Sequence, residues 1–145
     1  MNNIIENNKL IAKFMGFVAD KSFEVKLVDG INTSYYYYKD DVMYLPEVMA
    51  YHSDWSWLME VVEKIESLPT MKDNGNFFFE IHQDSVTVFN STRMDIIIEV
   101  MGQGSRINNT YQAVIEFIKW YNEQNKNNEK LTYITKVGII IVSLY

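Results

Sequence analysis

The sequence predicts a single α/β domain of the α+β kind, in which a mostly antiparallel sheet of about five strands is packed by three helices. Its 145 residues match the commonest size of one domain. Hydrophobic residues make up 48% of the chain, which is enough apolar surface to form a core. Apolar residues also recur at helical spacing in three segments and at every second position in others. The order is helix, two strands, helix, three strands, helix, with an extra strand at the C-terminus.

The first helix is expected from Ile4 to Met15, and Gly16 is expected to end it. A strand is predicted from Phe23 to Val28, where apolar and charged residues alternate. The Asp29-Gly30 pair is a strong turn signal. A second strand therefore follows from Ser34 to Lys39.

The second helix is predicted to begin with Ser53 as its N-cap and Asp54 in its first turn, and to stop shortly before Pro69. Its apolar residues recur at spacings of three and four and should face the core: Trp55, Leu58, Val62 and Ile65. The charged residues of the other side should face water: Glu60, Glu63 and Lys64.

A three-stranded antiparallel meander is predicted next, over Asn76–His82, Ser85–Asn90 and Met94–Met101. The side chains expected to point inward lie at alternate positions: Phe77, Phe79, Ile81, Val86, Val88, Met94, Ile96, Ile98 and Val100. The meander would form the larger part of the sheet.

The last helix should run from near Ser105 to about Gln124 and bury one stripe, with Phe117 at its edge: Ile107, Tyr111, Val114, Ile118 and Tyr121. The polar run Asn122–Lys130 is expected to form a loop. Residues 1–125 would form the domain. Residues 126–145 would add a β-branched strand that packs on the same domain or on a neighbouring subunit, because an unpaired strand would aggregate.

Composition excludes several classes of function. The net charge of −6 argues against general nucleic-acid binding, which needs clustered basic residues. The absence of cysteine excludes disulfides and thiolate zinc sites. No secretory signal and no bilayer-length apolar segment is found, so a cytoplasmic location is expected. No metal site and no cofactor is predicted, since His52 and an exposed His82 are the two histidines.

An anion site is one hypothesis for the segment Gly102-Gln103-Gly104-Ser105-Arg106, which leads from a strand into a helix. Free backbone N–H groups, the positive end of the helix dipole and one guanidinium could meet a phosphate there. The chain has two arginines, Arg93 and Arg106, and Arg106 is the first candidate. The alternative is a glycine-rich turn without a ligand.

The start of the second helix carries a second group of candidates. His52 and Asp54 could form an acid–base pair, but no nucleophile accompanies them, so a capped helix with Trp55 in the core is the other interpretation. Trp57, if exposed beside Tyr51, could stack on a base; otherwise it packs on the sheet or on a partner subunit.

A run of four tyrosines, Tyr35–Tyr38, sends two rings to each face of its strand. One face, carrying Tyr36 and Tyr38, is predicted to form an interface or a ligand wall. The alternative is an amphipathic cover over the sheet.

Three segments carry a resemblance to a known family: NKLIAKFMGF at Asn8–Phe17, YHSDWSWLMEVVEKIE at Tyr51–Glu66 and AVIEFIKWYNEQ at Ala113–Gln124. Together with the element order, they resemble the phage ABA sandwich domain of small phage and prophage proteins. The match covers about residues 8–125. Members of this family mostly have no assigned function, but accessory phage proteins of this size often counter host defence. The resemblance therefore implies a phage-encoded protein in the cytoplasm of the infected host cell, and the missing nucleophile and metal ligands predict that it is non-catalytic. By analogy with unrelated phage sponges, it would sequester a nucleotide-derived immune signal as a homo-oligomer.

Two alternatives remain open. The first is a protein–protein adaptor or inhibitor that blocks a host defence protein through the aromatic surface and the C-terminal strand. The second is an enzyme acting on a nucleotide, which the missing nucleophile and metal ligands disfavour. The ligand-binding candidates are Gly102, Gly104, Ser105, Arg106, Tyr36, Tyr38, His52 and Trp57, and no catalytic residue is predicted.

Overall fold

The computed structural model describes residues 2–26, 33–70 and 74–143. In this part of the chain, three α-helices and two antiparallel three-stranded sheets form an α+β fold, as the sequence predicts. The elements follow the order α1 (Asn2–Phe14), β1 (Val18–Lys26), β2 (Thr33–Lys39), β3 (Val42–Tyr44), the short 3-10 helix η1 (Pro46–Val48), α2 (Trp55–Ser67), β4 (Phe77–Ile81), β5 (Ser85–Asn90), β6 (Ile96–Met101) and α3 (Arg106–Ser143).

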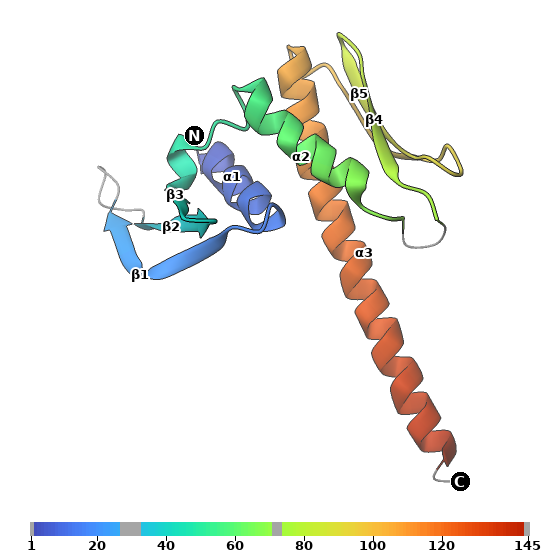
Figure 1. The fold of residues 1–145 in the computed structure, drawn as a ribbon. Helices are drawn as coiled ribbons and strands as arrows, with labels where there is room; N and C mark the ends of the chain where they lie inside the picture. Colours follow the sequence, from blue (N-terminus) through green and yellow to red (C-terminus); the bar gives the residue numbers. More distant parts are fainter. Residues whose placement is uncertain (1, 27–32, 71–73, 144–145) are drawn as a thin grey trace.

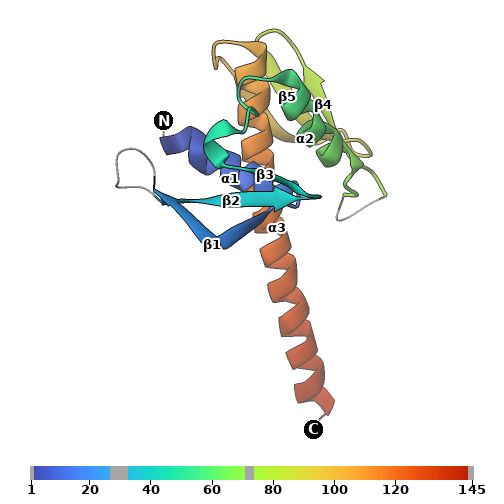
Figure 2. The same ribbon diagram turned by 60° about the vertical axis from the view of Figure 1, so that its left-hand side comes forward.

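The helices lie between the two sheets, and the second half of α3 projects away from both of them (Figures 1 and 2). One sheet has the order β1-β2-β3 and the other the order β4-β5-β6. The single sheet of about five strands is therefore a wrong prediction. The chain passes from β3 through η1 into α2 before β4 begins, so the two strand groups end on different sides of the helices.

The third strand of the first sheet was not expected from the sequence. Asp40 and Asp41 both adopt the left-handed conformation, with φ of 50° and 64°, and Lys39 pairs with Val42 across them. This is the geometry of a two-residue hairpin turn, in which short acidic residues tolerate positive φ. The predicted Asp29-Gly30 turn lies outside the described residues.

The end of α1 confirms the role predicted for Gly16. Its φ is +90°, its N–H donates to Lys13 O at 3.0 Å, and the N–H of Phe17 donates to Ala12 O at 2.9 Å. These two bonds form a Schellman motif, which favours glycine at the left-handed position. The helix ends there because both bonds turn the chain back on its last turn.

Two lysines satisfy further carbonyl groups at this end of α1. Lys39 Nζ donates to Met15 O at 2.9 Å, and Lys64 Nζ donates to Phe14 O at 2.6 Å. Lys64 thus faces the end of α1 rather than water, which corrects the prediction for the polar side of the second helix. Burial, followed by the charge of Lys39, lowers the pKa of Lys64.

The start of α2 differs from the prediction by one residue. Asp54 is the N-cap, and its Oδ1 accepts the N–H groups of Ser56 at 2.7 Å and Trp57 at 3.4 Å. Trp55 is consequently the first helical residue and is 39% exposed, so it does not anchor the core. Val61, which the sequence analysis did not assign to the core, is buried with the predicted Leu58, Val62 and Ile65.

A β-bulge redirects the first residues of β6. Val88 pairs with Ile98 but Phe89 pairs with Ile96, so Ile97 is an extra residue on the bulged strand. Ile97 packs against the core, whereas Met94 and Ile96 are exposed, contrary to prediction. The remaining predicted inward residues either belong to the core or pack against it: Phe77, Phe79, Ile81, Val86, Val88, Ile98 and Val100.

Helix α3 is longer than the sequence indicates. It begins at Arg106, close to the predicted start, but continues to Ser143. The structure therefore has a helix where the sequence predicted a loop over Asn122–Lys130 and a strand in residues 126–145. Both predictions are wrong for the residues up to Ser143. The polar run contains neither glycine nor proline, and adding a residue to a formed helix costs far less than nucleating one.

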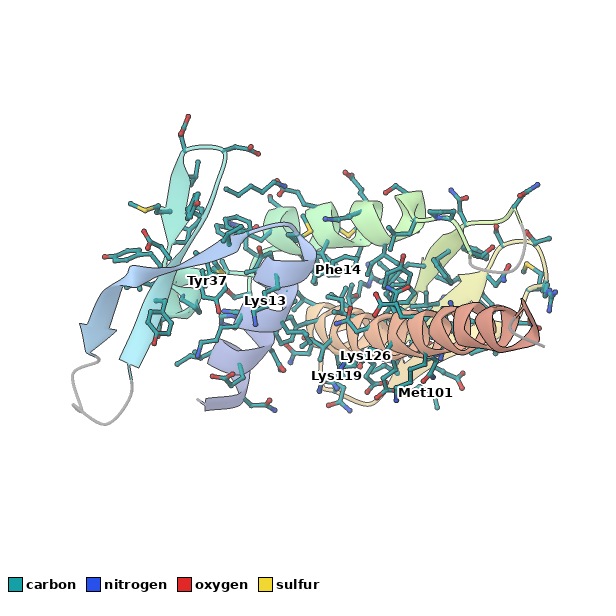
Figure 3. All side chains as sticks on the ribbon, turned by 90° about the horizontal axis from the view of Figure 1, so that it is seen from below. Lys13, Phe14, Tyr37, Met101, Lys119 and Lys126 are labelled. Carbon is teal, nitrogen blue, oxygen red and sulfur yellow. The ribbon has the colours of Figure 1, made fainter. Side chains whose placement is uncertain are left out.

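The core forms where the three helices meet the inner faces of both sheets. Figure 3 shows Phe14 between the helices and Tyr37 on the inner side of the first sheet, whereas Lys119 and Lys126 lie on the outer side of α3. Phe117 is fully buried and lies at the centre of the α3 stripe rather than at its edge. A single core therefore includes residues from both sheets.

Candidate functional site

The predicted ligand-binding residues lie in three separate places. Gly102, Gly104 and Ser105 lie in the connection between β6 and α3, and Arg106 is the first residue of α3. Tyr36 and Tyr38 belong to β2 in the other sheet, while His52 and Trp57 flank the start of α2. The structure does not bring the three groups together into one site.

Two backbone N–H groups at the glycine-rich connection donate to side chains of the same segment. Gly102 and Gly104 have φ of 74° and 90°, which explains why glycine stands at both positions. The N–H of Gln103 donates to Asn109 Oδ1 at 2.9 Å, and the N–H of Asn108 donates to Ser105 Oγ at 3.3 Å. Anion binding at this connection stays a prediction, in competition with the interpretation as a self-capped helix start.

The candidate residues around the start of α2 either cap the helix or pack against other rings. Asp54 acts as the cap of α2, and the His52 ring lies 6.1 Å from the Tyr111 ring. The Trp57 ring lies 5.1 Å from that of Tyr51 in an edge-to-face arrangement. Trp57 is partly buried and lines a cavity near the first sheet.

The faces of β2 differ in exposure, as the tyrosine run predicts. Tyr37 is buried in the core, whereas Tyr38 points to the outer face of the sheet and is exposed. Tyr36 lies on the same face as Tyr38, because side chains two positions apart on a strand share a face.

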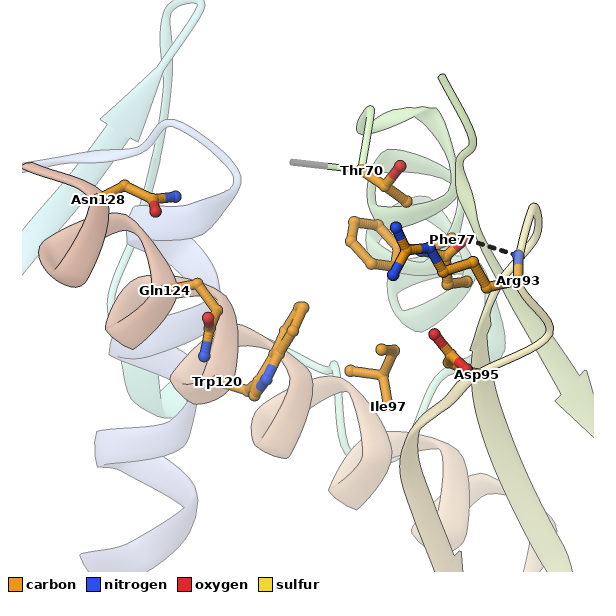
Figure 4. Close-up of a pocket in the computed structure, with 9 residues that line it drawn as sticks. Thr70, Phe77, Arg93, Asp95, Ile97, Trp120, Gln124 and Asn128 are labelled. Carbon is orange, nitrogen blue, oxygen red and sulfur yellow. Dashed lines mark hydrogen bonds between the residues drawn. The ribbon is translucent and has the colours of Figure 1, made fainter. Parts of the chain in front are cut away.

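A different cavity, here called the Arg93 cavity, gathers the most varied chemistry. It has a volume of about 220 Å³ and lies between α3 and the second sheet (Figure 4). Two charged side chains, four neutral polar ones and three apolar ones surround it: Arg93, Asp95, Thr70, Asn90, Gln124, Asn128, Phe77, Ile97 and Trp120. None of these was a candidate ligand residue in the prediction.

Helix α3 supplies one wall of the Arg93 cavity. Trp120, Gln124 and Asn128 follow each other at spacings of four and therefore share one helix face (Figure 4). Ile97 faces this wall because of the β6 bulge. The side chains thus come from elements that pack directly on each other.

A tight turn holds the two charged residues at the mouth of the cavity. Asn90 Oδ1 accepts the N–H groups of Thr92 at 2.9 Å and Arg93 at 3.4 Å. The N–H of Asn90 donates to Asp95 O at 2.9 Å, and Met94 adopts a φ of 56°. The turn therefore fixes the backbone that carries the guanidinium and the carboxylate.

The Trp120 indole is held from behind by other rings. Its centroid lies 5.8 Å from that of Phe77 and 5.6 Å from that of Phe117. Phe77 and Phe117 are buried, whereas Trp120 is only partly buried. A rigid ring with an accessible side is suited to stacking against a flat ligand.

Together these groups can bind a small polar ring. Arg93 can donate two parallel hydrogen bonds to a carboxylate or phosphate, and Asp95 can accept from N–H or O–H groups. The amides of Gln124 and Asn128 can do either. The volume is below the roughly 300 to 1,000 Å³ of drug-sized sites, so the cavity should enclose about one ring system and one charged group of its ligand.

Sequence reasoning missed this site for two reasons. The chain has two arginines, and the glycines that precede Arg106 made it a stronger candidate than Arg93. The last helix was expected to end near Gln124, so Asn128 could not be aligned with Trp120. The sequence did carry one signal of this site, because Trp120 lies outside the predicted apolar stripe of its helix.

The described part of the chain contains neither a metal-binding cluster nor a membrane-spanning helix. No group of three or more His, Asp or Glu residues is placed to hold a metal ion there. Across the same residues, none of the helices has the length and apolar character needed to cross a membrane.

Comparisons with family models, with curated proteins and with solved structures find no match to this chain.

Proposed function

We propose that this protein is a non-catalytic binding protein that captures a small planar anion, of the size of a nucleoside monophosphate, in the Arg93 cavity. The observation that carries the proposal is the placement of the Arg93 guanidinium and the Trp120 indole on the same cavity. A ring stacked on Trp120 would leave its anionic group within the reach of an arginine, while Asp95 would accept from amino groups on the ring edge. This combination suits a nucleobase that carries a phosphate.

The biological role belongs to the same proposal. Binding without conversion would let the protein sequester a nucleotide-derived signal, as expected for a phage-encoded counter-defence protein. The phage origin rests on the resemblance of three sequence segments to the ABA sandwich domain. The chemical part of the proposal rests on the cavity and can be tested alone.

The two arginines provide a matched pair of variants for the test. Binding of nucleoside monophosphates is measured by isothermal titration calorimetry, with thermal shift as a first screen, because a ligand of the folded state raises Tm. Arg93→Gln should weaken binding roughly 10- to 100-fold, as expected for the loss of a charged hydrogen bond. Arg106→Gln, also at an exposed arginine, should leave the affinity unchanged.

Three outcomes would contradict the proposal. Absence of binding by every monophosphate and aromatic carboxylate tested would remove the ligand class. Loss of binding in Arg106→Gln with retention in Arg93→Gln would move the site to the glycine-rich connection. If chromatography shows that the pure protein converts the bound nucleotide, the protein is an enzyme and the non-catalytic role is wrong.

A second candidate function, a protein adaptor or inhibitor, is favoured by an apolar row on the first sheet. Tyr38 pairs directly with Val18 on one side and with Met43 on the other, so the three side chains share one face. They are 44%, 56% and 59% exposed, respectively. A contiguous exposed apolar row of this kind suits a partner protein or a second copy of this chain.

The adaptor function predicts a different result from the same protein. Met43→Ser should abolish a complex seen by native mass spectrometry and leave nucleotide binding intact, because Met43 lies on the other sheet from the Arg93 cavity. The mass of the complex tells a homo-oligomer from a host protein. A complex that survives both Met43→Ser and Tyr38→Ser would rule out this surface.

A further inference from the structure

A second cavity, here called the Trp57 cavity, lies between the end of α1, the β2–β3 hairpin and the start of α2. Its volume is about 370 Å³. Aromatic and charged side chains form most of its lining, together with Met15, Val42 and Ser56: Phe17, Tyr44, Tyr51, Trp57, Lys39, Asp40 and Glu60. It shares no lining residue with the Arg93 cavity.

The aromatic rings of the Trp57 cavity form a connected cluster. The Trp57 centroid lies 5.0 Å from that of Tyr44 and 5.1 Å from that of Tyr51, and both pairs are edge-to-face. The Phe17 centroid lies 6.3 Å from that of Tyr44. The backbone N–H of Trp57 also donates to Asp54 Oδ1. Because the rings hold each other and the backbone of Trp57 is held by the cap, the wall exists before any ligand arrives.

The charges around these rings favour a cation. Asp40 and Glu60 are exposed carboxylates at the cavity. The opposing charge is Lys39, whose ammonium group already donates to Met15 O at 2.9 Å. This hydrogen bond holds the ammonium group at the end of α1, and the two carboxylates outnumber the one ammonium group among the lining residues.

The state of Tyr51 fits the same electrostatics. Burial, with a further contribution from the negative charge of Glu60, raises the pKa of Tyr51 to about 12. The negative charge of Glu60 is therefore close enough to act on the hydroxyl of Tyr51.

We propose that the Trp57 cavity binds an organic cation of the methylated ammonium class. A diffuse positive charge is attracted by the faces of Trp and Tyr rings, and methyl groups lose little solvation when they contact such rings. Asp40 and Glu60 would add long-range attraction at the rim. The cavity would thus give the protein a second ligand of opposite charge to the first.

Choline and its neutral analogue 3,3-dimethylbutan-1-ol provide a test, because the two have the same shape and differ in charge. The three tryptophan indole N–H signals are followed by NMR during titration of each compound, and Trp57 is assigned with Trp57→Phe. Choline should shift the Trp57 signal in a saturable way and leave those of Trp55 and Trp120 in place. The neutral analogue should produce a much smaller shift.

Two glutamate variants on α2 sharpen the result. Glu60→Gln should weaken choline binding roughly two- to fivefold, as expected for one exposed charge. Glu63→Gln removes an equal charge from an exposed position on the same helix that does not line the cavity, and should leave the affinity unchanged. Since both sites are exposed, folding should not be affected.

The proposal is overturned if choline leaves the Trp57 signal unshifted at millimolar concentration, or if the neutral analogue shifts it equally. Equal weakening by Glu60→Gln and Glu63→Gln would also overturn it, because the effect would then reflect net charge alone. None of these results depends on nucleotide binding at the Arg93 cavity.

Discussion

Asn8 illustrates how a single polar residue stabilises the core. Its side chain is 0% exposed, and its Nδ2 donates to Pro46 O at 2.8 Å and to Met49 O at 2.9 Å. The hydroxyl of Tyr111 donates to Asn8 Oδ1 at 3.3 Å. One amide therefore connects α1, η1 and α3, and satisfies buried polar groups that have to be paired.

Replacing Asn8 by leucine should lower the free energy of unfolding by about 2 to 5 kcal/mol, because buried carbonyl groups lose their donors. Urea denaturation of the purified variant measures this change. Asn3→Leu, at an exposed position of the same helix, should change stability by less than about 0.5 kcal/mol. Similar values for the two variants would show that the amide contributes little.

At the level of elements, two adjacent residues, Ser53 and Asp54, are candidates for the N-cap of α2. Asp54→Ala should cost about 1 kcal/mol, since its carboxylate accepts two backbone N–H groups. Ser53→Ala should cost much less, because Ser53, the cap predicted from the sequence, lies one residue before the actual N-cap. Thermal or urea unfolding of both variants decides between the positions, and the reverse order would restore Ser53 as the cap.

Secondary-structure elements also determine where the charged groups lie at the Arg93 cavity. The bulge in β6 and the turn closed by Asn90 determine where Ile97, Arg93 and Asp95 lie. Both depend on the pairing of β5 with β6. The shape of the Arg93 cavity therefore depends on the pairing within the second sheet.

The whole molecule should lose stability at high pH. Burial raises the pKa of both Tyr51 and Tyr111 to about 12, from the ordinary value of 10. Between pH 10 and 12 these tyrosines lose protons in the unfolded state before they do so in the folded state. The free energy of unfolding should therefore be unaffected by them below pH 10 and fall as pH rises towards 12.

This pH dependence can be measured by urea denaturation in a series of buffers from pH 8 to 12. Tyr111→Phe should flatten the slope between pH 10 and 12, although it also removes the hydrogen bond to Asn8. An unchanged slope in this variant would mean that Tyr111 ionises equally in both states.

The second half of α3 should contribute little to the stability of the whole molecule. Its second half extends beyond both sheets (Figures 1 and 2). A chain that ends after Lys130 keeps Asn128 and should retain both the Tm and nucleotide binding. A marked fall in Tm, with a smaller mass in native mass spectrometry, would instead place the projecting segment in a contact between copies.

Local signals determined a large part of this fold. Gly16 ends α1, Pro69 follows the end of α2, and the polar sequence after β6 starts α3 within a residue of the predicted place. Each signal works through hydrogen bonds or steric limits within a few residues, so the sequence alone carries it. The α+β class follows from periodicities of the same short range.

Other features were decided by tertiary structure. Ile97 faces inward only because β6 bulges against β5, and Arg93 and Trp120 line the same cavity only because that sheet packs on α3. The C-terminal segment has strand-like composition, yet it continues a helix whose nucleation the preceding residues have completed. By itself the sequence determined where elements begin and end and which class of fold they form. Tertiary structure decided the division into two sheets and the place of the site, because pairing partners distant in the chain set register, bulges and cavities.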